Sequence, residues 1–323
     1  MNIGIIGCGL IGKKRAKSIP AAHTIAGVCD IRMDRASELA AMTGCHFMAD
    51  DYKELIERPG LELVIVSTLN NRLAPITLYA VEHGKHVIVE KPGGICSAEL
   101  LPIMEAAEKN HVLVKVGFNH RYHPAMLKAK ELMEKEEVGE VMFIRGRYGH
   151  GGRVGYDREW RADASLSGGG ETIDQGVHLI DLARWYMGEF EEVSGFAATY
   201  FWDMPVDDNG FISLRKKDGR AAWLQVSCTE WKNMFSLEIY CKNAKLAIEG
   251  LGGSYGVEKL YYYQMLPKMG PPDTVIYEYP RGDRSWELEF SEVEEAIRTG
   301  KGLNMGDIRD AYEALKIVEK IYR

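Results

Sequence analysis

The segment 173–181 carries Asp174 and His178 four positions apart, with Asp181 next along the same face, while apolar residues at helical spacing line another face. On a helix this spacing puts both side chains on one face, where a carboxylate can orient an imidazole ring and stabilise its protonated form. Such a pair suits a general base that takes a proton from a hydroxyl group. A surface Asp–His pair is the alternative interpretation. No metal site is predicted, because this face offers too few ligands to close one.

Lys91 is a third candidate for chemistry, in the run Glu90-Lys91-Pro92-Gly93-Gly94. The run follows a predicted strand, and ligands of open α/β sheets bind at the carboxyl ends of the strands. Pro92 disfavours helical geometry at Lys91 and can fix the direction of the lysine. Taken alone, a solvated ion pair between Lys91 and Glu90 is the competing interpretation.

The run Gly7-Cys8-Gly9-Leu10-Ile11-Gly12 follows an apolar strand and predicts a turn that binds pyrophosphate. Gly7 would allow the tight turn, Gly9 the close approach of the diphosphate, and Gly12 the packing of the next helix. The N-terminus of that helix would point free N–H groups at the phosphates. Asp30 ends the next apolar run, at about the 20-residue distance expected of a carboxylate that accepts from the ribose hydroxyls. The sequence therefore predicts a bound dinucleotide.

Short apolar strands alternate with amphipathic helices over the first 120 residues. Such near-continuous apolar strands are typical of a parallel sheet covered on both faces. The predicted strands are 2–6, 24–29, 62–67, 86–90 and 113–117.

The pattern changes after a predicted helix at 124–136. Strand pairs such as 211–216 with 221–227, and 235–241 with 246–249, predict a mostly antiparallel sheet. Helices at 286–299 and 307–322 are expected to close this second domain. We therefore expect an α/β protein with domains at 1–120 and 121–323.

Composition limits the classes of partner. The formal charge of −7 argues against nucleic acid, and no apolar run approaches the ~18 residues of a membrane span. The first apolar run precedes its basic residues, unlike a signal peptide. Six cysteines without a C-x-x-C pair favour reduced thiols and a cytoplasmic location.

Together these motifs resemble the glucose-fructose oxidoreductase and inositol dehydrogenase family (Gfo/Idh/MocA), along essentially the whole chain. The matching residues are Gly7 to Gly12, Asp30, Ser67-Thr68-Leu69-Asn70, Gly84 to Pro92, Gly117-Phe118-Asn119-His120-Arg121, Trp160-Arg161 and Gly168 to His178. The resemblance implies an N-terminal Rossmann domain that binds a dinucleotide and a C-terminal α+β domain with a large, mostly antiparallel open sheet. It also implies a homodimer or homotetramer that oxidises or reduces sugars, inositols or related alcohols.

With the resemblance, Lys91, Asp174 and His178 become the catalytic candidates. The nicotinamide would take a hydride from a carbinol carbon, His178 the hydroxyl proton, and Lys91 would stabilise charge on the oxygen. The expected cofactor contacts are Gly7, Gly9, Leu10, Ile11, Gly12, Asp30, Ile31, Arg32, Ser67, Thr68, Asn70, Glu90 and Lys91. Asp30 favours NAD by repelling a 2′-phosphate, whereas Arg32 and Arg35 keep NADP as the alternative.

The substrate is expected to be an anionic sugar derivative: a sugar phosphate, a uronate or a nucleotide sugar. The segment before the glycine triplet carries guanidinium groups that suit phosphate or carboxylate, beside flat aromatic rings. With Lys91, Asp174 and His178, the substrate-binding candidates are Asn119, Arg121, Arg153, Tyr156, Arg158, Trp160 and Arg161. Neutral inositols or hexoses are the competing class. A sensor without turnover is the alternative of another kind, but it would be expected to lose Lys91 or His178.

Overall fold

The computed structural model describes residues 1–268 and 270–323. The chain forms two compact units. Unit 1 comprises residues 1–118, 165–168 and 286–315, and unit 2 comprises 119–164, 169–285 and 316–323. All the cofactor candidates, Lys91 included, therefore lie in unit 1, whereas Asp174 and His178 lie in unit 2.

Unit 1 contains a six-stranded parallel sheet in the order β3-β2-β1-β4-β5-β6. Its strands are β1 Asn2–Ile6, β2 Thr24–Cys29, β3 Met48–Ala49, β4 Leu63–Val66, β5 His86–Val89 and β6 Val114–Val116. This order is that of the doubly wound Rossmann fold, with the first strand near the centre. All five predicted strands are confirmed. The sequence prediction missed β3, which is only two residues long.

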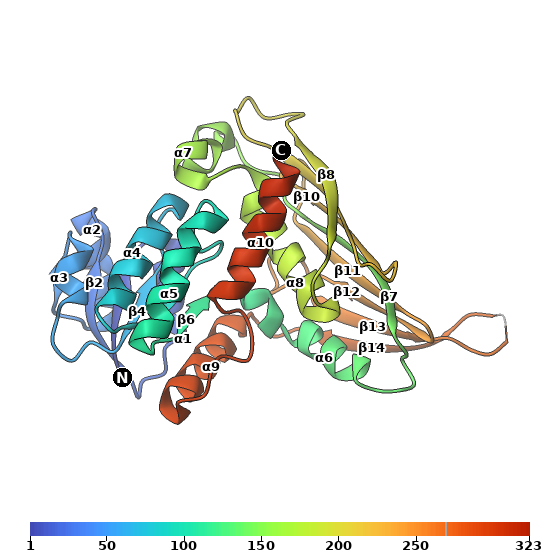
Figure 1. Ribbon diagram of the computed structural model, residues 1–323, viewed down its shortest axis with the longest axis horizontal. Coiled ribbons are helices and arrows are strands. Elements are labelled where there is room, and N and C mark those ends of the chain that lie inside the picture. Colours follow the sequence, from blue (N-terminus) through green and yellow to red (C-terminus); the bar gives the residue numbers. More distant parts are fainter. Residues whose placement is uncertain (269) are drawn as a thin grey trace. The chain divides into compact units, whose positions relative to one another are not determined.

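Helices surround this sheet (Figure 1). They are α1 Leu10–Ser18, α2 Met33–Thr43, α3 Tyr52–Ile56, α4 Asn70–Glu82 and α5 Leu101–Asn110. All four residues of β4 are buried, as expected for a strand covered on both faces.

Helix α9 (Ser285–Thr299) belongs to unit 1 from Trp286 onward, which corrects the expectation that it closes the second domain. Its Phe290 and Val293 are 1% exposed and pack in one core cluster with Ile3 and Leu63. The apolar face of this helix fits either domain by sequence pattern, and packing decides the choice. Helix α10 (Ile308–Ile321) begins in unit 1 and ends in unit 2.

Unit 2 contains an eight-stranded sheet in the order β14-β13-β12-β11-β7-β10-β9-β8. Its strands are β7 Val141–Gly149, β8 Glu192–Ala198, β9 Asn209–Arg215, β10 Ala221–Ser227, β11 Met234–Cys241, β12 Ala244–Glu249, β13 Glu258–Gln264 and β14 Asp273–Tyr279. Every neighbouring pair is antiparallel except β10 with β7. Both predicted strand pairs, 211–216 with 221–227 and 235–241 with 246–249, are confirmed.

Burial alternates along β11 and β13, so the sheet has one packed face and one open face there. In β11 every second residue is buried, the expected pattern when one face meets the core. Figure 1 shows α6 (Pro124–Met133) and α8 (Val177–Met187) on the packed side. The open face carries Phe143, Phe196 and Trp223, which are 41%, 53% and 57% exposed.

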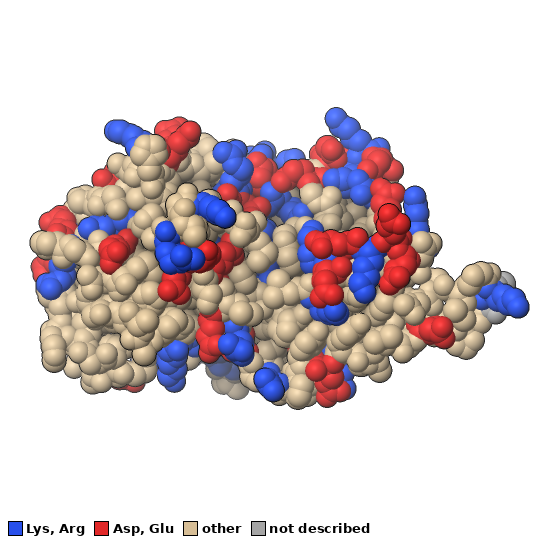
Figure 2. Space-filling model, turned by 90° about the horizontal axis from the view of Figure 1, so that it is seen from below, with Lys and Arg blue, Asp and Glu red and all other residues tan. Residues whose placement is uncertain are grey.

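Charged side chains of opposite sign lie next to one another on the face drawn in Figure 2. This face therefore presents no continuous basic stripe of the kind that follows a phosphate backbone. Within residues 1–268 and 270–323, no helix combines the length and apolar character needed to cross a membrane.

Candidate active site

The glycine turn of unit 1 has the geometry that phosphate binding requires. Gly7 has a φ of +93°, and a Cβ there would lie 2.4 Å from the carbonyl oxygen of Ser67. A Cβ on Gly12 would lie 2.0 Å from the carbonyl oxygen of Gly7. Gly9 instead faces open space, with nothing within 4 Å of a Cβ there, and no side chain caps the helix that begins at Leu10. The helix N-terminus is thus accessible to an anion.

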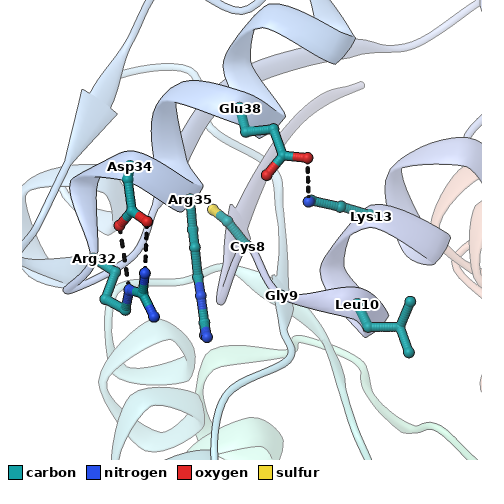
Figure 3. A pocket seen from close by; sticks show the side chains of 8 residues that line it. All are labelled: Cys8, Gly9, Leu10, Lys13, Arg32, Asp34, Arg35 and Glu38. Carbon is teal, nitrogen blue, oxygen red and sulfur yellow. Dashed lines mark hydrogen bonds and ion pairs between the residues drawn. The ribbon is translucent and has the colours of Figure 1, made fainter.

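Asp30 is held beside this turn by two backbone N–H groups. Cys8 N–H donates to Oδ2 at 2.8 Å and Arg32 N–H to Oδ1 at 2.9 Å. The side chain of Arg32 forms an ion pair with Asp34 at 2.7 Å, which neutralises a cation that could have attracted a 2′-phosphate. Cys8, Arg32 and Asp34 help to line a hollow of about 350 Å³, shown in Figure 3. A fixed carboxylate next to a glycine turn fits a dinucleotide with free ribose hydroxyls.

Other predicted cofactor residues hold the protein itself together. Ser67 Oγ donates to the carbonyl oxygen of Gly7 at 2.8 Å, and Asn70 Nδ2 donates to that of Ser167 at 2.9 Å. Ile31 is 89% exposed. Ser67 therefore fixes the glycine turn, and Asn70 of α4 holds the 165–168 segment within unit 1.

Glu90 and Lys91 follow β5 at the carboxyl edge of the parallel sheet, and the Lys91–Pro92 bond is cis. Lys91 is half-buried. The Glu90 carboxylate is buried and accepts from Arg15 Nε at 2.7 Å, and Arg15 also pairs with Glu289 of α9. Burial raises the pKa of Glu90, against the opposing effect of Arg15. Lys91 thus follows directly on a residue anchored in the core.

In unit 2, Asp174 lies in a π-helical turn over Thr172–Gly176, and His178 lies in the first turn of α8. The sequence prediction assumed α-helical spacing throughout, and the wider turn changes that geometry. His178 is 5% exposed. Asp174 Oδ2 accepts from Arg161 Nε at 2.9 Å, so a predicted substrate residue contacts a predicted catalytic one.

The turn is held by Asp207, which the sequence analysis did not single out. Its Oδ1 accepts from Gly170 N–H at 2.9 Å, and its Oδ2 from the N–H and hydroxyl of Thr172 at 2.8 and 2.6 Å. A Cβ on Gly170 would lie 1.9 Å from the Asp207 carbonyl oxygen. The last glycine of the triplet is therefore required by this contact.

A cluster of rings surrounds His178. The His120 ring lies 3.7 Å from the His178 ring between centroids, and Tyr148 of β7 lies 5.3 Å from His120. Tyr255 stands 5.1 Å from Tyr148. His120 entered the sequence analysis only inside a motif, because residues 58 apart in the chain give no local signal of contact.

The predicted substrate arginines mostly have carboxylate partners. Arg121 is buried and pairs with Asp181 at 2.5 Å, and Arg153 pairs with Glu159 at 2.6 Å. With the Arg161–Asp174 contact, three of the four proposed guanidinium groups are neutralised by the protein. Arg158 is exposed.

The remaining substrate candidates are held by neighbours within unit 2. Tyr156 is buried, with its ring 5.6 Å from Trp202, and the Trp160 ring packs 4.5 Å from Arg161. Asn119 Nδ2 donates to Ser285 Oγ at 2.8 Å.

Two family models match the chain. Residues 1–118 match the oxidoreductase family with an NAD-binding Rossmann fold, and residues 126–247 match the GFO/IDH/MocA C-terminal domain. Together they cover most of the sequence.

Among curated proteins, the levoglucosan dehydrogenase of Pseudarthrobacter phenanthrenivorans is 25% identical over 88% of this chain and 75% of its own. The scyllo-inositol 2-dehydrogenase (NAD(+)) of Bacillus subtilis is 26% identical over 95% and 89%. Among solved structures, levoglucosan dehydrogenase in complex with NADH superposes with a TM-score of 0.90 at 22% identity, over 99% of this chain and 95% of that one. This last likeness concerns the fold.

Proposed function

The chain is an NAD-dependent dehydrogenase of the GFO/IDH/MocA oxidoreductase family, and we propose that it oxidises a secondary hydroxyl group of a neutral polyhydroxylated ring, such as an inositol or an anhydrohexose. The observation that carries the proposal is the charge balance of the 150–161 loop and its neighbours. Arg121, Arg153 and Arg161 each have a carboxylate partner within the protein. An anionic substrate would have to displace these partners, whereas a neutral polyol needs only hydrogen-bond donors and acceptors.

The relatives support the same choice. Their names give levoglucosan and scyllo-inositol as substrates, and neither carries a charge. The anionic sugar derivative expected from the sequence alone is therefore the weaker candidate.

Each proposed catalytic residue has a defined task. NAD, when bound, would accept the hydride from the carbinol carbon. His178 takes the hydroxyl proton at a ring nitrogen of its buried imidazole. Asp174 stabilises the protonated ring, and Arg161 holds the Asp174 carboxylate in place by donating to it. The Lys91 ammonium stabilises negative charge on the substrate oxygen.

The test is turnover with matched pairs of substrates. Absorbance of the reduced cofactor is followed with scyllo-inositol, myo-inositol and levoglucosan, and with a hexose phosphate, a uronate and a nucleotide sugar. We expect kcat/KM for at least one neutral compound to exceed that for every anionic one by about tenfold or more, the scale of one unpaired polar group. Faster turnover of an anionic compound would contradict the proposal. If the protein binds NAD but reduces it with none of these compounds, the alternative of a sensor without turnover is favoured.

Arginine variants provide the matched control. Arg153→Ala removes an exposed ion pair with Glu159 and is expected to leave the neutral substrate's kcat/KM almost unchanged. Arg161→Ala removes the partner of Asp174 and is expected to lower kcat. If both variants raised KM for an anionic substrate alone, the loop would be an anion site after all.

We also propose that the open face of the unit 2 sheet joins copies of this chain. Its aromatic rings pack in pairs, with Phe143 on Tyr240 at 4.2 Å and Phe196 on Phe211 at 4.8 Å. Large exposed apolar side chains gathered on one sheet face favour a partner surface. A second copy is the partner of choice because the same face would then cover itself about a twofold axis.

A further inference from the structure

The rings of His120 and His178 form a close, tilted pair inside unit 2, the histidine pair. Their ring centroids are 3.7 Å apart with 36° between the planes, and the two side chains are 6% and 5% exposed. His120 comes from the 3-10 helix Asn119–Tyr122, and His178 from the start of α8. Two imidazolium ions at this separation would repel each other strongly, so the pair carries one positive charge more readily than two.

A chain of hydrogen bonds determines which ring nitrogen of His120 carries a proton. Ser285 Oγ donates to the Asp283 carboxylate at 2.5 Å, which leaves its lone pairs to accept from Asn119 Nδ2 at 2.8 Å. The Asn119 amide is thereby oriented with its Oδ1 toward His120 Nδ1, 3.3 Å away. His120 therefore donates from Nδ1.

The carboxylate at the far end of this chain favours positive charge on His120. A hydrogen bond from Nδ1 to an acceptor that is itself polarised by a carboxylate stabilises the imidazolium form. The side chain of Asp283 is 27% exposed and also lies 3.9 Å from His123 Nε2. When the histidine pair takes up one additional proton and becomes positively charged, we expect that proton to reside on His120.

We propose that His120 is a positioning residue that carries the single positive charge of the histidine pair. In this way it keeps His178 unprotonated and able to accept the substrate proton. The proposal rests on the proposed function of His178 as the base. It adds a residue to the reaction whose effect reaches the substrate only through the His178 ring.

The other charged groups near His178 each lie close to a partner. On the elements that pack against α8, Asp174 is paired with Arg161, and Arg121 with Asp181 of α8 itself. His123 pairs with Glu258 at 2.8 Å, and the buried Glu171 lies 3.6 Å from His150 Nε2.

Two phenols and a strand complete these surroundings. Tyr148 of β7 stays neutral because burial raises its pKa well above the usual value, and burial also raises the pKa of Tyr255. Strand β10 carries no acidic or basic side chain.

The test compares two variants that disturb the pair from different sides. His120→Phe keeps a ring against His178 but cannot carry a proton. Ser285→Ala leaves both rings in place and breaks the link between Asn119 and Asp283. In each variant the proton taken up first should move to His178, and its pKa should rise.

The primary measurement is a histidine NMR titration of the protein without cofactor or substrate. The His178 signal is assigned by its loss in His178→Asn. We expect its midpoint to move upward by about one pH unit in His120→Phe, the scale of one nearby like charge, and in the same direction in Ser285→Ala. The acidic limb of the kcat/KM profile should move with it.

The outcomes are separable from those of the proposed function. A His178 midpoint that is unchanged in both variants overturns the proposal, whatever the activity. A shifted His178 midpoint in a protein that oxidises none of the sugars supports the proposed role of His120 and contradicts the proposed substrate class. If His120→Phe does not fold, Ser285→Ala decides, since it removes one hydroxyl group and keeps every ring.

Discussion

Tyr322, the next-to-last residue of the chain, donates its phenolic hydroxyl to Asp207 Oδ1 at 2.9 Å. The same Tyr322 oxygen accepts from Ile173 N–H at 3.2 Å. Asp207 in turn holds Gly170 and Thr172, at the start of the π-helical turn that carries Asp174. The C-terminal end of the chain thus fixes the geometry of a candidate catalytic residue.

Tyr322→Phe is therefore expected to affect both stability and catalysis. Loss of the hydroxyl should lower the free energy of unfolding by about 1 kcal/mol, the scale of one hydrogen bond, and should lower kcat more than it changes KM. Urea denaturation and steady-state kinetics measure the two effects. Tyr200→Phe, on a side chain that is 67% exposed, is the matched control and should change neither. An unchanged kcat in Tyr322→Phe would mean that the turn is held by Asp207 alone.

Buried tyrosines should make the protein sensitive to alkali. Burial raises the pKa of Tyr148, Tyr186 and Tyr322 well above the usual value of 10.0. A folded-state pKa above that of the unfolded chain gives stability that is fully present below pH 10 and is lost as the pH rises above it. The free energy of unfolding, measured from neutral pH to above 10, should fall on the alkaline side. Tyr186→Phe should make that slope shallower, and an identical slope would contradict the assignment.

The Arg32–Asp34 ion pair should help to select NAD over NADP. Asp30 repels a 2′-phosphate, and Asp34 occupies the guanidinium that could bind one. Asp34→Ala frees Arg32, so NADP affinity should rise by about tenfold or more, the scale of a charged hydrogen bond. Titration calorimetry with both cofactors measures this. Glu295→Ala, which breaks an exposed ion pair with Arg298 on α9, is the control. Tighter binding of NADP by the unchanged protein would remove the argument.

Substitution of the catalytic candidates should lower turnover without loss of the cofactor. Lys91→Met and His178→Asn should each reduce kcat by roughly a hundred- to ten-thousand-fold, since we propose that both groups act on the reacting oxygen. Asp174→Asn should cost less, because the imidazole remains. Calorimetry should give NAD affinities close to that of the unchanged protein, and Arg158→Ala, an exposed residue, should retain activity. Activity within a few-fold of normal in either of the first two variants would contradict their roles.

The open sheet face should control assembly. Light scattering is expected to give a mass well above the 36.3 kDa of one chain. Trp223→Glu places a charge among the exposed rings of that face and should shift the mass toward one chain. Val154→Glu, on a fully exposed loop residue outside the sheet, should not. A single-chain mass for the unchanged protein at micromolar concentration would show that the face needs no second copy.

Much of the fold followed from local sequence patterns. The strands of unit 1 were predicted because both of their faces are buried, which leaves short apolar runs such as Leu63–Val66. The strand pairs of unit 2 were predicted from hairpin signals, such as Asp218-Gly219 between the runs 211–216 and 221–227. The glycine turn was recognisable because a close backbone approach leaves room for no other residue at Gly7 and Gly12.

Contacts between distant residues could not be predicted in this way. Arg161 and Arg153 look alike in the sequence as cations near the glycine triplet, and only the folded chain gives the first to Asp174 and the second to Glu159. The Asp207–Tyr322 bond and the His120–His178 contact likewise join residues far apart in the chain. The sequence by itself determined the strands, the cofactor turn and the candidate base, because backbone periodicity and steric demand are local. The tertiary structure decided which charges are neutralised and which rings meet, because those properties depend on packing between segments far apart in the chain.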